Sequence, residues 1–461
     1  MQMNFCKAQN TLYINNDSDK PVGKIDPITI TGNYSSFIIT QKKTASSNYI
    51  WFEAPIQLDK AHIDSFNCQN SFFRNFIMKN CVIKYVAIFD RISSVNLYID
   101  SNLFQNDINI NGRFENYKFI NFSFIKNNVQ GKASFSESAF NSSKFNFTTF
   151  SKPVQFDGCN FSNTLFYHVD FLDSITFSNS TYEGISFLSS NFQKTLNLSR
   201  VGFSGKVIFD SCHFFKGLII SSINPNISFS FKNIILPDTL DLSNNPVINT
   251  PIDLTDVQFH DDGKKCAIFF YKTAIDKIQI DYKYFELKFK IIDGHEMSKN
   301  EKEIVYESLL KNFKDQSSNE NYELLDIEYR NFKNGWFIWP HYWDCYGYHK
   351  GWIFIWTPCF LILYTLITFL CIDNLTKFVY KINYIPNLPS LKQTMKMKHK
   401  LRVLRRRIWL SFAYTSTIFF LFLLKVENIK FKNWKGVVYL LFIYGTGLVC
   451  LAYMANFVLQ K

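Results

Sequence analysis

The sequence predicts a parallel β-helix preceded by a β cap, then a helical linker and an all-α transmembrane domain. Three observations lead to this fold class. Phe, which accounts for 50 of the 461 residues, recurs at every fifth position through the middle of the chain. A charged, helix-prone stretch follows, and three apolar runs occupy the C-terminal part. We expect the four parts to cover residues 1–64, 65–262, 263–334 and 335–461, the last with two or three helices.

The five-residue step is strict between residues 114 and 192. One extra residue enters after every fourth step, and Phe occupies fourteen of the sixteen positions. Neither an α-helix nor a single strand has a period of five, but a coil of four short sides does. We predict an internal ladder of aromatic rings from Phe114, Phe119, Phe135, Phe140, Phe145, Phe150, Phe156, Phe161, Phe166, Phe171, Phe177, Phe187 and Phe192.

The residue two positions before each step is small or β-branched, as at Ala133, Ser138, Val154 and Cys159. We expect this residue to point inward as well, so that large and small side chains alternate in the core. Stacked coils then repeat at strand spacing, roughly 4.8 Å. Weaker continuations of the step predict further inward positions upstream, at Phe72, Ile77, Val82, Ala87, Tyr98, Leu103 and Ile108.

The triplets Cys159-Asn160-Phe161 and Val169-Asp170-Phe171 match a small residue, a polar residue and then Phe. In these triplets the chain resembles the pentapeptide-repeat family over about residues 65 to 260. The resemblance implies a right-handed quadrilateral β-helix.

The linker is expected to be a helical hairpin over residues 299–316 and 318–333, because both stretches are charged and helix-prone. Ser298 and Glu301 have the spacing of a capping box at the start of the first helix.

Three apolar runs cover residues 352–372, 408–424 and 436–459. The first and third runs are long enough to cross a bilayer. The second has about the minimum length for crossing, so it either spans the bilayer or forms a re-entrant segment. Trp and Tyr residues at positions 336–352 precede the first run, as in an interfacial aromatic belt.

A basic stretch without an acidic residue lies between the first two runs. An anionic lipid headgroup is the partner we favour for it, since the stretch adjoins a membrane segment. A nucleic-acid contact and a solvated loop are the alternatives. The lipid contact would be made by Lys396, Lys398, Lys400, Arg402, Arg405, Arg406 and Arg407.

The tail also resembles the two-helix ion-channel-like module of membrane-bound pentapeptide-repeat proteins of bacteria, through Tyr346-Gly347-Tyr348 before the first run. The resemblance implies a pore helix that contains Tyr414, Thr415, Ser416 and Thr417. It also implies a filter, but residues 421–425 (LFLLK) replace the Gly-containing carbonyl ladder of a potassium filter.

The motifs of common enzyme and metal sites are not found in the sequence, so we expect no catalytic residues, metal or other cofactor. The ten Cys form no CxxC pair, and Cys159 and Cys212 fall in the small inward position, which predicts buried thiols and a reducing compartment. Ten N-x-[ST] sequons reflect the abundance of Asn, Ser and Thr.

These observations favour a non-enzymatic, membrane-anchored scaffold whose partners are lipids and a protein or a second copy of the chain, and we expect no nucleic-acid partner. An oligomeric ion-channel-like pore regulated by the β-helix is the alternative. The net charge of +12 argues against a third class, rods that imitate DNA, because those need an acidic surface.

With no signal peptide visible, we expect a bacterial inner-membrane protein with its β-helix in the cytoplasm. The basic stretch argues for the opposite orientation, because positive loops stay on the cytoplasmic side.

Overall fold

The computed structural model describes residues 11–14, 28–39, 50–52, 55–112, 118–199, 201–203, 205–259, 262–289, 296–335, 346, 348–380, 397–420 and 433–459. The chain divides into two compact units, residues 1–325 and 326–461. Each unit is described by itself.

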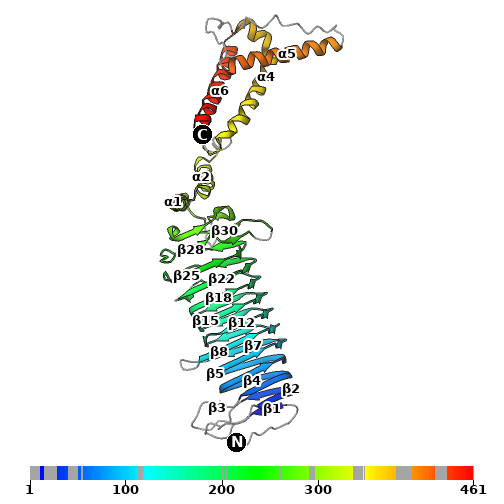
Figure 1. The fold of residues 1–461 in the computed structure, drawn as a ribbon, viewed down its shortest axis with the longest axis vertical. Coiled ribbons are helices and arrows are strands. Elements are labelled where there is room, and N and C mark those ends of the chain that lie inside the picture. Colours follow the sequence, from blue (N-terminus) through cyan, green and yellow to red (C-terminus); the bar gives the residue numbers. More distant parts are fainter. Residues whose placement is uncertain are drawn as a thin grey trace. The chain divides into compact units, whose positions relative to one another are not determined.

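The first unit is a β-solenoid, in which short strands stack in successive coils and every strand pair is parallel (Figure 1). Thirty strands form one sheet, and β28 and β31 form a second sheet of two strands. The first sixteen strands are β1 (Thr11–Ile14), β2 (Ile28–Ile39), β3 (Ile50–Phe52), β4 (Ile56–Lys79), β5 (Val82–Asp100), β6 (Leu103–Phe104), β7 (Asp107–Asn111), β8 (Lys118–Ile125), β9 (Asn128–Val129), β10 (Ala133–Ser136), β11 (Ala139–Asn141), β12 (Lys144–Asn146), β13 (Thr149–Phe150), β14 (Val154–Asp157), β15 (Asn160–Tyr167) and β16 (Asp170–Phe171).

The later strands continue the same stack. They are β17 (Ile175–Ser178), β18 (Thr181–Leu188), β19 (Asn191–Phe192), β20 (Leu196–Asn197), β21 (Gly202–Phe203), β22 (Lys206–Asp210), β23 (His213–Phe214), β24 (Gly217–Ile219), β25 (Ser228–Lys232), β26 (Ile234–Ile235), β27 (Thr239–Asp241), β28 (Ile252–Leu254), β29 (Val257–Gln258), β30 (Cys266–Phe269), β31 (Ile278–Ile280) and β32 (Phe285–Lys288), with the 3₁₀ turns η1 (Ile275–Lys277) and η2 (Tyr282–Tyr284).

One coil takes 21 residues in the middle of the solenoid, where Phe135 pairs with Phe156 and Phe156 with Phe177. Beyond β18 the coil lengthens to 22 residues, since Phe187 pairs with Phe209 and Phe209 with Phe231. This added residue explains why the strict step of five ends after Phe192.

The corners between strands use left-handed backbone. The residue two positions after the inward Phe has a positive φ at Glu137 (46°), Ser142 (51°) and Phe147 (51°), and the same positions recur one coil later. The fourth corner of the coil, after Phe150, contains the extra residue and no positive φ. A non-Gly residue in the left-handed region is uncommon, so three such residues in one coil mark tight, regular turns.

The core of the solenoid is a set of columns of stacked aromatic rings. In one column Phe145, Phe166, Phe187, Phe209 and Phe231 follow one another with centroid separations of 4.7, 4.8, 5.1 and 5.4 Å. The predicted ladder residues are all buried in the structure except Phe114, which lies outside the described residues. The twelve small or β-branched residues that lie two positions before each step, from Ala133 to Ser190, are buried as well.

The upstream extension of the five-residue step was wrong for most of its positions. Tyr98 is 38% exposed, and Ile77, Val82 and Leu103 are only partly buried, whereas Ala87 and Ile108 do face inward. The core positions there are instead Phe76, Met78, Leu97 and Ile99, one residue to either side. In a strand, neighbouring side chains point to opposite faces, so a shift of one residue exchanges core and surface.

The stack begins before residue 65. β2 pairs with β4 in parallel, with Phe37 beside Phe66, and their rings stack at 5.4 Å. The described strands of residues 1–64 therefore continue the same sheet.

Helix α1 (Lys299–Asp315) lies against the C-terminal end of the solenoid. The capping box predicted at Ser298 and Glu301 is present. The buried Asn312 side chain donates hydrogen bonds to the carbonyls of Ile275 (3.1 Å) and Ile278 (2.6 Å). These bonds attach α1 to the last turns of the solenoid. Helix α2 (Asn319–Asn334) follows, and Asn321 accepts a hydrogen bond from the Tyr282 amide (2.8 Å).

The second unit contains the helices α4 (Ile353–Phe378), α5 (Met397–Phe419) and α6 (Trp434–Leu459), with a short 3₁₀ turn η4 (Lys350–Trp352) before α4. Figure 1 shows α4 and α6 running in opposite directions and α5 lying across them. Two helices of the described residues, α4 and α6, are long and apolar enough to cross a membrane. The second predicted run is not a separate apolar helix: its described part, up to Phe419, continues a helix that begins in the basic stretch.

Candidate functional site

The interior of the solenoid uses its polar side chains for structure. The Asn127 side chain accepts a hydrogen bond from the backbone N–H of Asn102 (2.9 Å) and donates one to the backbone carbonyl of Ile99 (2.8 Å). Ser180 does the same for the Cys159 amide (3.0 Å) and the Phe156 carbonyl (3.2 Å). At the corners of a coil the backbone ladder is interrupted, so a small polar side chain from the next coil satisfies groups that would otherwise be buried without partners.

The cysteines of the solenoid share this role. Cys159 and Cys212 are buried free thiols that donate to the carbonyls of Phe135 (3.2 Å) and Phe187 (3.3 Å). Burial raises the pKa of each thiol to about 12. A thiol with such a pKa stays protonated at neutral pH and is a poor nucleophile. These residues are therefore core components.

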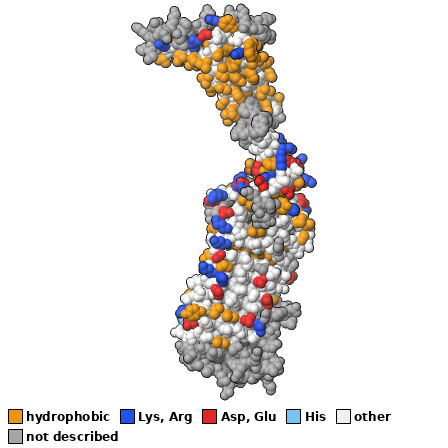
Figure 2. All heavy atoms as spheres, turned by 180° about the vertical axis from the view of Figure 1, so that it is seen from behind, with side chains coloured by type: hydrophobic (Ala, Val, Ile, Leu, Met, Phe, Trp, Pro, Cys, Tyr) orange, Lys and Arg blue, Asp and Glu red, His pale blue; other side chains and the backbone are white. Residues whose placement is uncertain are grey.

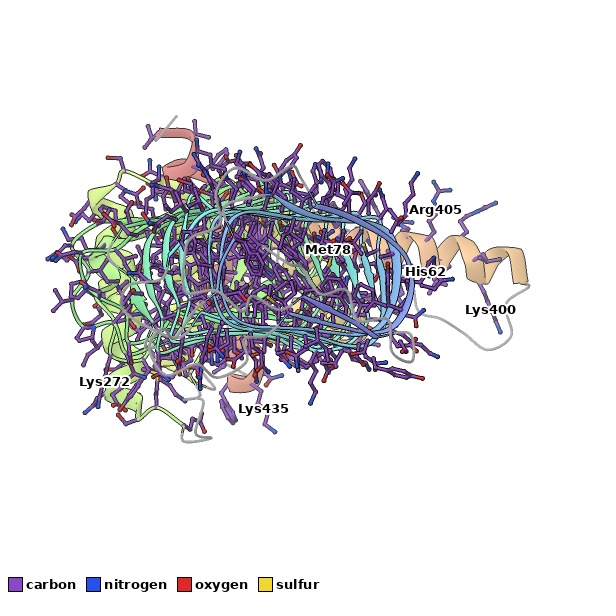
Figure 3. All side chains as sticks on the ribbon, turned by 90° about the horizontal axis from the view of Figure 1, so that it is seen from below. His62, Met78, Lys272, Lys400, Arg405 and Lys435 are labelled. Carbon is purple, nitrogen blue, oxygen red and sulfur yellow. The ribbon has the colours of Figure 1, made fainter. Side chains whose placement is uncertain are left out.

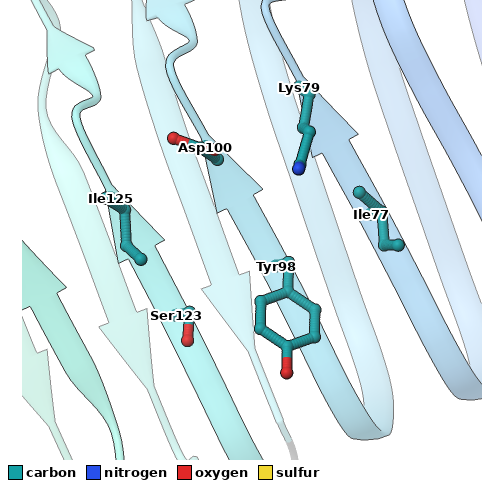
Figure 4. A pocket seen from close by; sticks show the side chains of 6 residues that line it. All are labelled: Ile77, Lys79, Tyr98, Asp100, Ser123 and Ile125. Atoms are coloured by element: carbon teal, nitrogen blue, oxygen red, sulfur yellow. The ribbon is translucent and has the colours of Figure 1, made fainter.

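A shallow depression lies on the outer face of β4, β5 and β8. It has a volume of about 240 Å³ and is lined by Ile77, Lys79, Tyr98, Asp100, Ser123 and Ile125 (Figure 4). Lys79 and Asp100 are register neighbours on adjacent strands, and Ser123 follows Tyr98 in the same way. No group of metal-binding side chains occurs in the described part of the chain, so the depression carries no metal site.

The helical unit exposes many apolar side chains. Figure 2 shows hydrophobic side chains gathered over the helical unit, whereas the solenoid face in view carries scattered charges of both signs. On α4, Ile355, Ile362, Leu366 and Leu370 are all exposed. A water-soluble bundle would bury such a row, so this surface suits an apolar environment.

The C-terminal half of α5 packs between α4 and α6. Tyr414, Thr415, Ile418 and Phe419 are buried, and the predicted pore-helix residues Ser416 and Thr417 are half-buried. The predicted filter segment, residues 421–425, lies outside the described residues.

A chain of hydroxyl groups joins the three helices. Thr415 of α5 donates to Thr368 of α4 (2.9 Å), and Thr368 shares a hydrogen bond with Tyr439 of α6 (3.1 Å). Tyr439 in turn donates to the Tyr364 carbonyl (2.8 Å). Hydrogen bonds between helices are a main source of specific association in lipid, where burial of apolar surface gives no preference.

The N-terminal half of α5 exposes its basic side chains. Arg402, Arg405 and Arg406 are exposed, and Lys400 is half-buried. Figure 3 shows Lys400 and Arg405 pointing to opposite sides of the helix. Lys396 lies outside the described residues, and Lys398 is within α5, but its side chain is not described.

Arg407 differs from the other predicted lipid contacts, because it pairs with Asp373 of α4. Its side chain is only 12% exposed. Sequence reasoning missed Asp373, since it follows directly after the uncharged run of residues 352–372. An acidic residue at the end of an apolar run was the only available signal, and nothing in the sequence indicated which basic residue it meets.

The approach to α4 is held by a second polar cluster within this unit. The buried Asp326 carboxylate accepts hydrogen bonds from Arg330 (2.7 Å) and from the Tyr348 hydroxyl (2.8 Å). Tyr346 donates to Asn331 (2.7 Å). The tyrosines of the Tyr346-Gly347-Tyr348 motif therefore attach the segment just before the apolar helix α4 to α2.

The described residues thus define a β-solenoid protein whose helical unit carries two apolar helices. Comparison with known protein families, with curated proteins and with solved structures finds no match for this chain.

Proposed function

We propose that the protein is a non-enzymatic, membrane-anchored scaffold. Helices α4 and α6 span the bilayer, and the solenoid presents its regular outer faces to a protein partner or to a second copy. The observation that carries this proposal is the set of exposed apolar side chains on α4 and α6. Hydrogen bonds of Thr368 and Tyr439 hold these two helices together. The solenoid core is filled with rings, which leaves its outer surface for binding.

The repeat supports a finer assignment of the solenoid. We place it with right-handed quadrilateral β-helices of the pentapeptide-repeat type. The support comes from the inward Phe at every fifth residue, the small inward residue two positions earlier, and three left-handed corners in each coil.

Membrane extraction tests the anchoring. The full chain is expressed in cells, and the membranes of these cells are washed in carbonate at alkaline pH. They are then treated with a mild detergent. We expect the chain to stay in the pellet in carbonate and to enter solution only with detergent. Release by carbonate alone would refute two membrane spans.

A pore is the second candidate, favoured by the half-inserted α5 and by Thr415 and Thr368 meeting in the interior of the helical unit. An oligomer is required, because three helices do not enclose an aqueous path. Discrete single-channel currents from the purified chain in planar bilayers would support the pore. Electrical silence of a reconstituted oligomer would exclude the pore, and the scaffold would remain the proposed function.

The charge of the segments beside the two proposed spans supports one orientation of the chain. Between the two helices, residues 381–432 hold twelve Lys and Arg and one acidic residue, whereas the twenty residues before α4 hold two Lys. Positive loops stay cytoplasmic, so this count supports a cytoplasmic α5 and a solenoid on the other side of the membrane. Our expectation of a cytoplasmic β-helix rested on the missing signal peptide. The free thiols of the solenoid agree with that expectation, but they are buried in the core, and we give the charge count more weight.

Translation of the full chain with microsomes tests the sidedness, because the sequons of the solenoid act as reporters. Asn197 and Asn226 are exposed, and Asn226 lies in a turn. We expect a mobility shift that an endoglycosidase removes and that is absent when the exposed solenoid sequons are changed from Asn to Gln. A shift only when a sequon tag is inserted into residues 381–396 would show the reverse orientation.

A further inference from the structure

We propose that the N-terminal half of α5 lies in the plane of the membrane and binds the phosphate groups of an anionic bilayer surface through Arg402, Arg405 and Arg406. Arg407 takes no part in this binding. The inference rests on the proposed function, because α4 and α6 must first place α5 at a bilayer.

The side chains of α5 sort into three faces at 100° per residue. Val403, Leu410 and Tyr414 lie on one face and are buried within the helical unit. Leu401, Leu404 and Ile408 form a second, apolar face that is exposed, with Leu401 61% and Ile408 48% exposed. Arg402, Arg405 and Arg406 lie on the third face, next to the apolar one.

This division is the pattern of a helix at a membrane interface, with an apolar stripe toward the acyl chains and a basic stripe at headgroup level. Trp409, which is 67% exposed, lies among the arginines on the basic face. Trp favours the headgroup region, where its ring is buried and its N–H finds an acceptor. No acidic residue occurs within α5, so nothing on the helix itself neutralises the arginines.

The rest of the unit holds α5 across the spans. Arg407 pairs with Asp373 near the end of α4, Tyr414 is buried, and Thr415 donates to Thr368. These contacts keep α5 crosswise to α4 and α6, as Figure 1 shows. The N-terminal half of α5 begins beyond the Arg407–Asp373 pair, near the end of α4, and a helical segment that leaves two bilayer spans near one of their ends lies along the membrane surface. Continuity with the spans and complementary charge therefore identify the occupant of the exposed faces as an anionic bilayer.

The arginine fork suits phosphate because it presents paired N–H donors to two oxygens. Each basic residue near an anionic surface strengthens binding by a factor of about five, so removal of three is expected to weaken it roughly a hundredfold.

The test uses the full chain in a neutral detergent, titrated with phosphatidylglycerol or phosphatidylcholine, with bound lipid counted by native mass spectrometry. We expect phosphatidylglycerol to bind more tightly than phosphatidylcholine, and R402Q/R405Q/R406Q to abolish the difference. The charge-matched variant K144Q/K152Q/K194Q, whose lysines are exposed on the solenoid, should keep it. R407Q should retain the lipid affinity within about twofold but lower the melting temperature without lipid, since it breaks the pair with Asp373.

Unchanged phosphatidylglycerol binding in the triple arginine variant would overturn the inference. So would loss of binding on addition of inorganic phosphate alone, or preferential binding of duplex nucleic acid to the same arginines. A circular-dichroism spectrum of the triple variant that matches the parent chain shows that the fold is intact. Failure of this test with carbonate-resistant membrane attachment would reject the lipid site and leave the anchor in place.

Discussion

Gly447 of α6 lies directly against the backbone carbonyl of Phe419, the last residue of α5. A Cβ at Gly447 would fall 1.9 Å from the carbonyl oxygen and 2.7 Å from the carbonyl carbon. Only glycine permits this approach, and the approach sets how deeply the end of α5 inserts between α4 and α6.

Gly447→Ala is therefore expected to displace the end of α5, because the group that blocks the new methyl is backbone and cannot rotate away. The melting temperature of the helical unit in detergent should fall by several degrees. Gly445→Ala is the matched control, since a Cβ there meets nothing within 4 Å and alanine favours the helix. Equal melting temperatures for the two variants would contradict this contact.

Phe166 and Phe147 predict opposite results for the same substitution. Phe166 is fully buried between Phe145 and Phe187, whereas Phe147 is 50% exposed at a left-handed corner. Phe166→Ala should lower the free energy of unfolding of the solenoid by roughly 3–5 kcal/mol. Phe147→Ala should change it by under about 1 kcal/mol. Denaturant titration of both variants measures the difference, and similar losses would argue against the ring columns as the core.

Asn127 and Asn128 are adjacent at the start of β9, but the Asn127 side chain is buried and the Asn128 side chain is exposed. Asn127→Ala leaves the Asn102 amide and the Ile99 carbonyl buried without these partners, at a cost of about 1–3 kcal/mol each. Asn128 is exposed, so Asn128→Ala should be close to neutral. Amide hydrogen exchange at residues 99–102 gives a local readout, and we expect faster exchange only in the Asn127 variant. Unaltered protection there would mean that water replaces the side chain.

The buried thiols predict a loss of stability in alkali. The pKa of Cys159 rises from 9.0 to about 12 on burial, and those of Cys68 and Cys212 do the same. Above pH 9 the unfolded chain releases these protons while the folded chain retains them, which favours unfolding. The stabilising contribution is therefore complete below pH 9 and declines as the pH rises toward 12.

Unfolding free energies at pH 8 and pH 10.5 measure this effect. Cys159→Ser should reduce the decline, because serine does not ionise in this range and occupies the same inward position at Ser180. In the folded chain, Cys159 and Cys212 should resist alkylation at pH 8. Rapid alkylation under native conditions would show that the coils open.

The sequence by itself determined the β-solenoid and the two apolar helices. Phe side chains at every fifth position can be buried together in few folds. An uncharged run of more than twenty residues is stable in few environments. The sequence did not determine which residues face inward upstream of residue 112. The pattern from Phe72 to Tyr98 is compatible with either strand face, and only pairing with neighbouring coils selects one.

The tertiary structure alone decided which groups of the helical unit meet. Arg407 and Asp373 are 34 positions apart, and Thr368 and Thr415 are 47 apart. No local pattern links them, because such contacts depend on the crossing of three helices. The same crossing separates Arg407 from its three exposed neighbours, although all four look alike in the sequence.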